Sequence, residues 1–204
     1  MNDEVKRFIY WKDWWSDKYR FQIGEGVRYF PFKVALNLFL QRGGMNIVET
    51  GTTRAYNDFG GAGMATIFLG DFACRYGKHL WTVDILPEAI ALSMGLTMEF
   101  AENISYITDD SLNFLEKFNR QIDFLYLDSY DYPIDENEEE SLASQTHQLN
   151  EFKAAEDKLH DKSIVLLDDN AWNNGGKCKL TKEYLIEKGW ECLIDDFQSL
   201  WIKK

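Results

Sequence analysis

The chain has 204 residues, a formal net charge of −12 and 45% hydrophobic residues, a size and composition that suit one domain with a substantial core. The acidic balance argues against nucleic-acid binding, because phosphates are bound by clusters of Lys and Arg and the sequence has no such cluster. No run of about 18 apolar residues occurs, so we expect neither a membrane span nor a membrane partner.

Two further features predict a cytoplasmic protein. The first seven residues, 1–7, are mostly charged or polar and lack the apolar core of a secretion signal. The three cysteines, Cys74, Cys178 and Cys192, are scattered and lack the paired spacing of a metal site. Scattered thiols in odd number are typical of a reducing compartment.

Predicted strands and helices alternate from residue 46 onwards. Before that point, the N-terminal segment 1–44 predicts one or two short helices over 2–20 and an amphipathic helix over 31–42, which ends at Gly43-Gly44. Its many aromatic residues predict packing on the sheet or on a second subunit, so a homodimer stays an open alternative, and an aromatic lid over the substrate is a third. The predicted strands are 46–50, 80–84, 104–108, 123–127, 163–168, 190–195 and 198–202. The predicted helices are 63–76, 87–99, 111–118, 145–159 and 178–188.

This alternation predicts an α/β fold. Strands that alternate with helices form βαβ units, which build a parallel sheet with right-handed crossovers. The linker between the last two strands is too short for a parallel crossover, so these strands should be antiparallel. We therefore expect one domain, 1–204, whose core over 45–204 is a Rossmann-like, doubly wound, mostly parallel seven-stranded sheet with a C-terminal antiparallel hairpin. The acidic stretch 135–140 predicts a solvated loop.

Polar residues follow the first three predicted strands. In open α/β sheets the ligand crevice lies at the carboxyl ends of the strands. The first strand runs into Glu49-Thr-Gly51-Thr52, where a glycine lets the backbone approach a ligand closely. Asp84 ends the second strand, where a carboxylate can accept hydrogen bonds from both ribose hydroxyls of a nucleoside. Asp110-Ser111 follows the third strand, and a helix N-cap is the alternative role for that Asp.

Carboxylates also follow the fourth and fifth predicted strands. Asp128 comes after one apolar run, and Asp168-Asp169-Asn170 ends the other. Since the tips of neighbouring parallel strands lie side by side, Asp128, Asp169 and Asn170 are expected to converge on one hard cation through oxygen ligands.

Together these pieces resemble the class I S-adenosylmethionine-dependent methyltransferases. The nearest likeness is to the cation-dependent O-methyltransferases that act on catechols, caffeoyl thioesters and sugars. In these enzymes an Asp after the fourth strand and an Asp-Asn pair after the fifth bind Mg²⁺. The resemblance implies that S-adenosyl-L-methionine is contacted by Glu49, Gly51, Thr52, Gly63, Asp84, Asp110, Ser111 and Asp128.

The resemblance also implies that Mg²⁺, or another hard divalent cation, is held by Asp128, Asp169 and Asn170. In the related sugar O-methyltransferases the pair after the fifth strand is two acids, so Asp168 is the alternative ligand. The loop between Gly51 and Gly63 is longer than the family pattern.

The general base is the point at which the sequence departs from the family. The catechol group has a Lys three residues after the first metal-binding Asp, whereas this chain has Asp131. A carboxylate beside a cation has a low pKa and is a weak base, so Asp131 is a candidate fourth ligand. His147 is the candidate base if the acidic loop 134–143 folds over the pocket, and the alternative is that the metal alone acidifies the acceptor hydroxyl. The expected catalytic residues are thus Asp128, Asp131 and His147.

We therefore expect Mg²⁺-assisted O-methylation of a small-molecule acceptor, with a sugar or glycoside hydroxyl favoured. A non-catalytic methyltransferase-like domain that binds ligands or proteins within a larger assembly is the alternative. A nicotinamide-dependent oxidoreductase is disfavoured, because no Gly-x-Gly-x-x-Gly directly follows the first strand.

Overall fold

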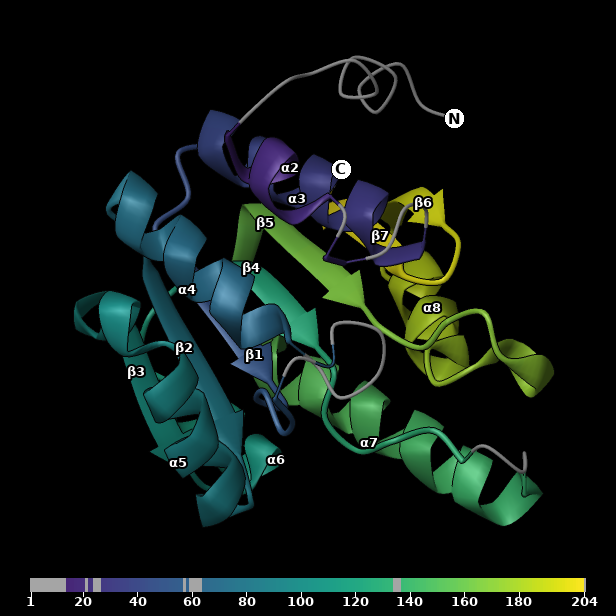
Figure 1. Ribbon diagram of the computed structural model, residues 1–204. Helices are drawn as coiled ribbons and strands as arrows, with labels where there is room; N and C mark the ends of the chain where they lie inside the picture. Colours follow the sequence, from purple (N-terminus) through teal and green to yellow (C-terminus); the bar gives the residue numbers. More distant parts are fainter. Residues whose placement is uncertain are drawn as a thin grey trace.

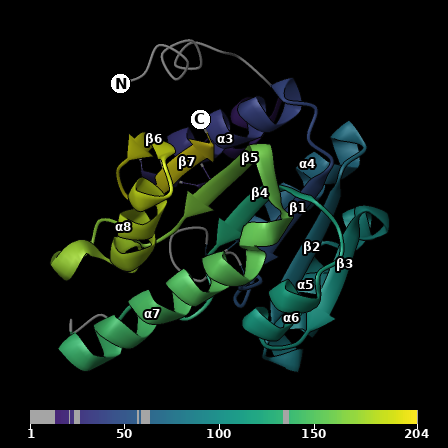
Figure 2. The same ribbon diagram turned by 180° about the vertical axis from the view of Figure 1, so that it is seen from behind.

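The computed structural model describes residues 14–20, 22–23, 27–56, 58, 64–133 and 137–203. A seven-stranded sheet in the order β3-β2-β1-β4-β5-β7-β6 forms its centre, with helices on both faces (Figure 1, Figure 2). Strands β1 to β5 are parallel, and β7 is antiparallel to both of its neighbours. The doubly wound α/β sheet with a C-terminal antiparallel hairpin is thus confirmed. Among the described residues, no helix combines the length and apolar character needed to cross a bilayer.

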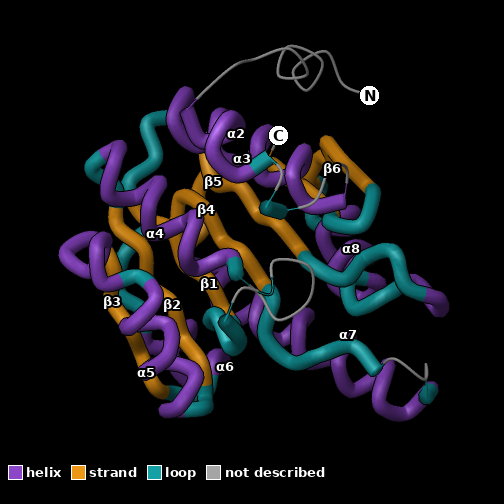
Figure 3. Tube along the Cα trace, viewed as in Figure 1, coloured by secondary structure: helices purple, strands orange, loops and turns teal. Residues whose placement is uncertain are grey.

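The elements alternate along the chain as expected (Figure 3). The strands are β1 (Asn46–Thr50), β2 (His79–Asp84), β3 (Ile104–Thr108), β4 (Ile122–Leu127), β5 (Leu159–Leu167), β6 (Trp190–Asp195) and β7 (Ser199–Lys203). The helices are α2 (Trp14–Tyr19), α3 (Tyr29–Gln41), α4 (Ala65–Tyr76), α5 (Pro87–Leu96), α6 (Ser111–Lys117), α7 (Glu138–Ala155) and α8 (Lys179–Glu187). Short 3₁₀ turns cover η2 (Met98–Asn103), η3 (Glu156–Lys158) and η4 (Asn173–Gly175).

Each face of the sheet carries its own apolar cluster. Helices α3 and α4 pack on one face over side chains such as Ile47 and Phe124. Helices α6, α7 and α8 cover the other face over Val48 and Leu125. Consecutive residues of β1 and β4 enter opposite clusters because successive strand side chains point to opposite faces. Burial on both faces explains why most of β4, from Phe124 to Leu127, is a continuous apolar run in the sequence.

The N-terminal helices are fastened to α4 and to the sheet. Asp71 of α4 accepts hydrogen bonds from the side chains of Lys18 and Tyr19. The Phe32 ring of α3 contacts Phe68 of α4 with a centroid separation of 4.7 Å. The described part of the segment 1–44 therefore packs on the sheet, which is one of the three arrangements predicted for it.

Helix α7 begins earlier than the sequence predicted. The Asn137 side chain accepts hydrogen bonds from the backbone N–H groups of Glu139, at 3.0 Å, and Glu140, at 3.2 Å. Glu138, Glu139 and Glu140 form the first turn, where the helix dipole favours negative charge. The loop prediction was wrong for these three residues, because a capping Asn turns an acidic run into a helix start. Residues 134–136 lie outside the described residues.

The cap at Asn137 predicts a stability loss in Asn137→Ala. Leaving two N–H groups of the first turn without their side-chain acceptor should lower the free energy of unfolding by about 1 kcal/mol. Urea denaturation measures the change. Asn150→Ala, an exposed site in the same helix, is the matched control and should be neutral or slightly stabilising because Ala favours helix. Equal losses in both variants would contradict the capping role.

Candidate functional site

A pocket of about 560 Å³ opens at the carboxyl ends of β1, β2, β3 and β4. This volume is typical of small-molecule sites, and the place is where parallel α/β sheets bind their ligands. The pocket is lined by loops that are far apart in sequence. Among its lining residues are Gly51, Asp84, Asp110, Ser111, Asp128 and His147.

Gly51 forms the floor of this pocket and has to be a glycine. Its φ is +82°, and a Cβ there would lie 2.4 Å from the carbonyl oxygen of Asp128. Its N–H donates to the carbonyl oxygen of Val83 at 2.9 Å. The absence of a side chain therefore lets the loops after β1 and β4 close against each other.

Asp84 is held at the tip of β2 with its carboxylate in the pocket wall. Its Oδ2 accepts from the N–H of Thr52 at 3.2 Å, and its Oδ1 from the N–H of Leu86 at 2.9 Å. Each carboxylate oxygen has a second acceptor position, so Asp84 can still bind two ligand hydroxyls. The Thr52 hydroxyl is buried and bonded to Thr66 and Ser93, so Thr52 supports the pocket through the N–H that holds Asp84.

Asp110 and Ser111 line the same pocket beside His147. Asp110 caps α6, because its Oδ1 accepts from the N–H groups of Leu112 and Asn113. Asp110 therefore both caps α6 and lines the pocket, so the two roles considered for it are compatible. The Ser111 hydroxyl lies 3.2 Å from His147 Nε2.

His147 belongs to α7, so a helix fixes its position and the acidic loop does not. Its Nε2 lies 3.5 Å from Glu151 Oε1, and this hydrogen-bonding carboxylate raises the pKa of His147. The structure thus places His147 against Ser111 and Glu151, next to the expected nucleoside contacts.

Glu49 stands behind the pocket wall. It is 1% exposed, and its Oε2 accepts from the Thr66 hydroxyl at 2.8 Å, which joins β1 to α4. Burial raises the pKa of Glu49 to about 8. The structure therefore gives Glu49 a supporting position, whereas the sequence predicted a cofactor contact. Gly63, another predicted cofactor contact, lies outside the described residues.

The buried Glu49 predicts a pH-dependent stability. Its pKa is raised from 4.5 to about 8, so the folded protein keeps a proton that the unfolded chain releases within this window. The free energy of unfolding should therefore fall as pH rises from 4.5 to about 8. Glu49→Gln should remove this part of the fall in urea denaturation across the same range. The exposed Glu88→Gln is the control, and an unchanged slope in Glu49→Gln would contradict the assignment.

Three carboxylates gather where β4 and β5 end. Asp168 is fully buried, and the side chains of Asp128 and Asp169 are 16% and 18% exposed. Arg28, just before α3, places its Nε 2.9 Å from Asp168 Oδ2 and its Nη2 3.6 Å from Asp169 Oδ1. Burial acts to raise the pKa of Asp168, but the positive charges of Arg28 and Lys177 and the hydrogen bonds from Tyr126 and Arg28 together hold that pKa below its usual range. The Tyr126 hydroxyl donates to Asp128 and Asp168.

The ammonium of Lys177 lies between Asp128 and Asp169. Its Nζ is 3.2 Å from Asp128 Oδ1, 3.3 Å from Asp169 Oδ2 and 3.0 Å from the carbonyl oxygen of Ser129. Lys177 is 1% exposed. Burial and the charge of Asp168 raise the pKa of Asp128 to about 7, against the opposing charge of Lys177. Sequence reasoning missed Lys177 and Arg28 as site residues, and the signal for Lys177 was the Gly175-Gly176 pair directly before it.

Asn170 faces away from this cluster. Asp169 has a φ of +57°, and the chain turns there. The Asn170 Nδ2 donates to Asp195 Oδ1 at 2.9 Å, and its Oδ1 accepts from Lys182 Nζ at 3.0 Å. The expected convergence of Asp128, Asp169 and Asn170 is therefore not what the structure shows.

The side chains present do not fit the expected divalent cation. An ammonium fills the space between Asp128 and Asp169, and the third expected ligand binds Lys182. In the part of the chain that the structure describes, no group of three or more His, Cys, Asp or Glu side chains is arranged to hold a metal ion. Asp168, the alternative ligand, is occupied by Arg28, Tyr126 and Gln198.

Asp131 pairs with Arg54 at the pocket rim. The two guanidinium nitrogens lie 2.9 and 2.6 Å from the two carboxylate oxygens. The hydrogen bonds from Arg54 lower the pKa of Asp131. The low pKa expected from the sequence thus arises from an arginine, whereas a neighbouring cation was the expected cause.

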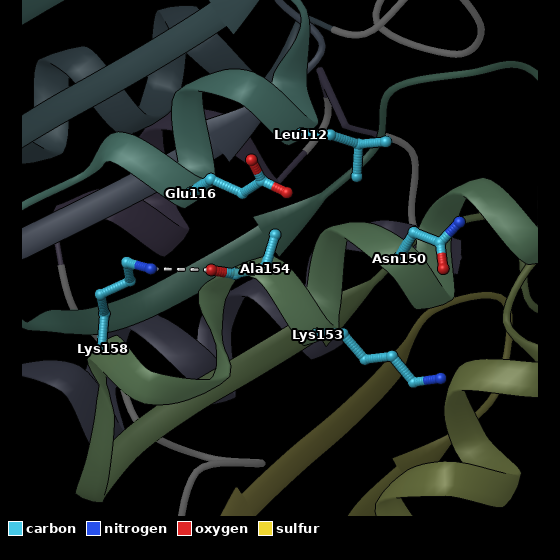
Figure 4. Close-up of a pocket in the computed structure, with 6 residues that line it drawn as sticks. All are labelled: Leu112, Glu116, Asn150, Lys153, Ala154 and Lys158. Carbon is cyan, nitrogen blue, oxygen red and sulfur yellow. Dashed lines mark hydrogen bonds between the residues drawn. The ribbon is translucent and has the colours of Figure 1, made fainter.

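A second hollow, of about 550 Å³, lies between α6 and α7 (Figure 4). It is lined by Leu112, Glu116, Asn150, Lys153, Ala154 and Lys158. The Lys158 ammonium donates to the Ala154 carbonyl oxygen at 2.9 Å. None of the predicted site residues lines this hollow, so the pocket at the strand tips is the candidate site.

Comparison with known protein families identifies the family to which this chain belongs. A family model described as a methyltransferase domain matches residues 59–170, more than half of the chain. The chain belongs to this methyltransferase family. No curated protein sequence matches it.

Solved structures share the fold of this methyltransferase. The S-adenosylhomocysteine-bound methyltransferase PaMTH1 of Podospora anserina aligns with a TM-score of 0.61 and 13% identity, over 100% of this chain and 89% of that one. The O-methyltransferase NovP aligns with a TM-score of 0.57 and 13% identity, over 83% and 76%. SMU.1697c of Streptococcus mutans, a putative methyltransferase in complex with S-adenosylhomocysteine, gives 0.51 and 12%, over 85% and 98%. Family and fold together make this protein a class I S-adenosylmethionine-dependent methyltransferase.

Proposed function

We propose that this methyltransferase transfers the methyl group of S-adenosylmethionine to a hydroxyl of a small polyhydroxylated molecule, such as a sugar or glycoside. One observation carries the proposal. A single pocket joins Asp84 and Asp110, which suit a nucleoside, to Asp128, where the cluster of carboxylates begins. A cofactor bound along this pocket would direct its sulfonium toward the carboxylates.

The nucleoside end supplies the contacts that the cofactor needs. Asp84 accepts hydrogen bonds from the ribose hydroxyls, and Asp110 with Ser111 contacts the adenine. Gly51 allows the cofactor to lie against the backbone after β1, because no side chain fills the floor.

The carboxylate end suits both reactants. Three acidic side chains against two basic ones, Arg28 and Lys177, leave a negative surplus that attracts the positively charged sulfonium. Methyl transfer requires the acceptor oxygen to stand behind the methyl group, so positioning supplies much of the rate. Asp128 is the member of this cluster that lines the pocket, and we propose that it accepts a hydrogen bond from the acceptor hydroxyl, orients it and takes its proton as the methyl group passes from the sulfur to the oxygen.

The pocket rim supports a hydroxyl-rich acceptor. Arg54, Asp131, Ser129 and Tyr130 line the pocket near Asp128 and offer donors and acceptors at its edge. The likeness to NovP, an O-methyltransferase, agrees with transfer to oxygen. Magnesium assistance is not part of this proposal, because the acidic side chains already have ammonium and guanidinium partners.

Cofactor binding tests the proposal directly. S-adenosylhomocysteine should bind the native protein in calorimetry, and Asp84→Asn should weaken binding by about tenfold or more, because hydrogen bonds from the ribose to a charged acceptor are lost. Glu88→Gln, an exposed acid at the start of the next helix, removes the same charge and should bind normally. Binding of a nicotinamide dinucleotide in place of S-adenosylhomocysteine would refute the assignment.

Turnover separates the enzyme from a non-catalytic binding domain. The native protein should transfer labelled methyl groups to members of a panel of sugars and glycosides. If the protein binds the cofactor but transfers no methyl group to the sugars and glycosides, nor to phenols and amines added to the panel, the non-catalytic binding domain would be favoured.

Substitution of His147 tests whether this side chain contacts the cofactor or acts as a general base. Its bond to Ser111 places it at the nucleoside end, so His147→Ala should weaken S-adenosylhomocysteine binding by roughly threefold to tenfold. The maximal rate and its pH profile should stay close to those of the native enzyme. Loss of an ionisation near neutral pH, together with most of the rate and with unchanged cofactor affinity, would instead make His147 the base.

A further inference from the structure

A buried cation, the ammonium of Lys177, lies behind the carboxylate end of the pocket, where Asp128 lines it. Lys177 Nζ has three oxygen neighbours, which are Asp128 Oδ1, Asp169 Oδ2 and the carbonyl oxygen of Ser129. Two carboxylates and a carbonyl are the ligand types that a hard divalent cation takes. An ammonium has three N–H donors, so these three oxygens match its hydrogen-bonding capacity.

We propose that Lys177 takes the place of a divalent cation in this site, so that the methyl transfer needs no metal ion. The inference rests on the proposed function, since it concerns the acceptor end of the same pocket. Lys177 acts as a positioning residue: its ammonium holds Asp128 and Asp169 in a fixed geometry, and Asp128 then orients the acceptor.

The loop before α8 is built to hold Lys177 in this position. Gly176 has a φ of +63°, and a Cβ there would lie 2.4 Å from the carbonyl oxygen of Asn170 and 2.5 Å from that of Asp169. The Lys177 N–H donates to the Asp169 carbonyl oxygen at 2.9 Å. From α7, Gln145 Nε2 donates to the Gly176 carbonyl oxygen at 3.0 Å. The backbone of Lys177 is therefore hydrogen-bonded to Asp169, after the end of β5, and the side chain of Lys177 neutralises the carboxylate of that same residue.

The local charges agree with an ammonium better than with an added metal ion. Asp128, Asp168 and Asp169 carry three negative charges when ionised, and Arg28 and Lys177 carry two positive ones, which leaves one negative charge. A divalent cation added to this set would leave a net positive charge and would lie against the ammonium. Without Lys177, three carboxylates and one guanidinium leave two negative charges, which a divalent cation would neutralise.

Two substitutions of Lys177 separate its charge from the space it fills. Lys177→Ala removes the ammonium and opens room between the carboxylates. Lys177→Met removes the charge but keeps a side chain of similar length in that room. Lys182→Ala is the matched control, because Lys182 bonds Asn170 and Asp195 away from the cluster.

The probe is Mn²⁺, followed by electron paramagnetic resonance and by thermal unfolding in EDTA and in MnCl₂. Native protein, Lys177→Met and Lys182→Ala should show no specific Mn²⁺ site, and their melting temperatures should be the same in both buffers. Lys177→Ala should bind one Mn²⁺ ion with an affinity roughly 100-fold higher than any non-specific Mn²⁺ binding by the native protein, because its carboxylates have lost their ammonium. Its melting temperature should fall in EDTA and recover in MnCl₂ through mass action.

Tight Mn²⁺ binding by the native protein, abolished by Asp169→Asn, would overturn the proposal. So would a folded Lys177→Ala protein, judged by its circular dichroism, that binds Mn²⁺ no better than the native one. If Lys177→Ala does not fold, the native Mn²⁺ titration alone decides. S-adenosylhomocysteine titrations of the native protein in EDTA report separately on the proposed function, so failure of cofactor binding leaves the metal result readable.

Discussion

The structure depends on neutralising three carboxylates at the ends of two neighbouring buried strands. Unpaired, ionised carboxylates inside a protein are strongly destabilising, whereas paired and hydrogen-bonded ones are tolerated. Arg28 neutralises Asp168 from the start of α3, and Lys177 neutralises Asp128 and Asp169 from the loop before α8. The acidic cluster thereby ties α3 and the loop before α8 to the centre of the sheet.

The same constraint shapes the pocket. Lys177 and Arg28 contact the cluster without lining the pocket, whereas Asp128 and Gly51 both line it, so Asp128 stays accessible to a ligand there. Gly51 keeps the loops after β1 and β4 in close contact, and Asp84 is fixed by two backbone N–H groups. Asp84 and Asp128, each held by hydrogen bonds or ion pairs, therefore border one cavity, and fixed side chains of this kind suit the alignment of two bound molecules.

The fold was readable from the sequence because its signals are local. A buried strand such as β4 is a short, mostly apolar run, and the parallel direction of the strands follows from their alternation with helices. The start of α7 was missed because an acidic run has the composition of a loop, and only the capping contacts of Asn137 make it helical.

The site was readable only in part, because side-chain direction and long-range partners are not local. Asp84, Asp110 and Asp128 were predicted as pocket residues from their place after strands, and the structure puts all three in one pocket. Asn170 has the right residue type, but the left-handed turn at Asp169 directs it toward the C-terminal hairpin. The Gly175-Gly176 pair marked a tight turn before Lys177, but it could not show the partner of that lysine, because Asp128 lies 49 positions earlier in the chain.

A crystal structure of the native protein with S-adenosylhomocysteine and MnCl₂, with anomalous data at the manganese edge, is the most direct test of this account. We expect the ribose at Asp84, the sulfur directed toward Asp128, Lys177 Nζ between Asp128 and Asp169, and no anomalous peak in that space. A manganese peak between these carboxylates with Lys177 displaced, or a cofactor bound outside the pocket at the strand tips, would contradict it.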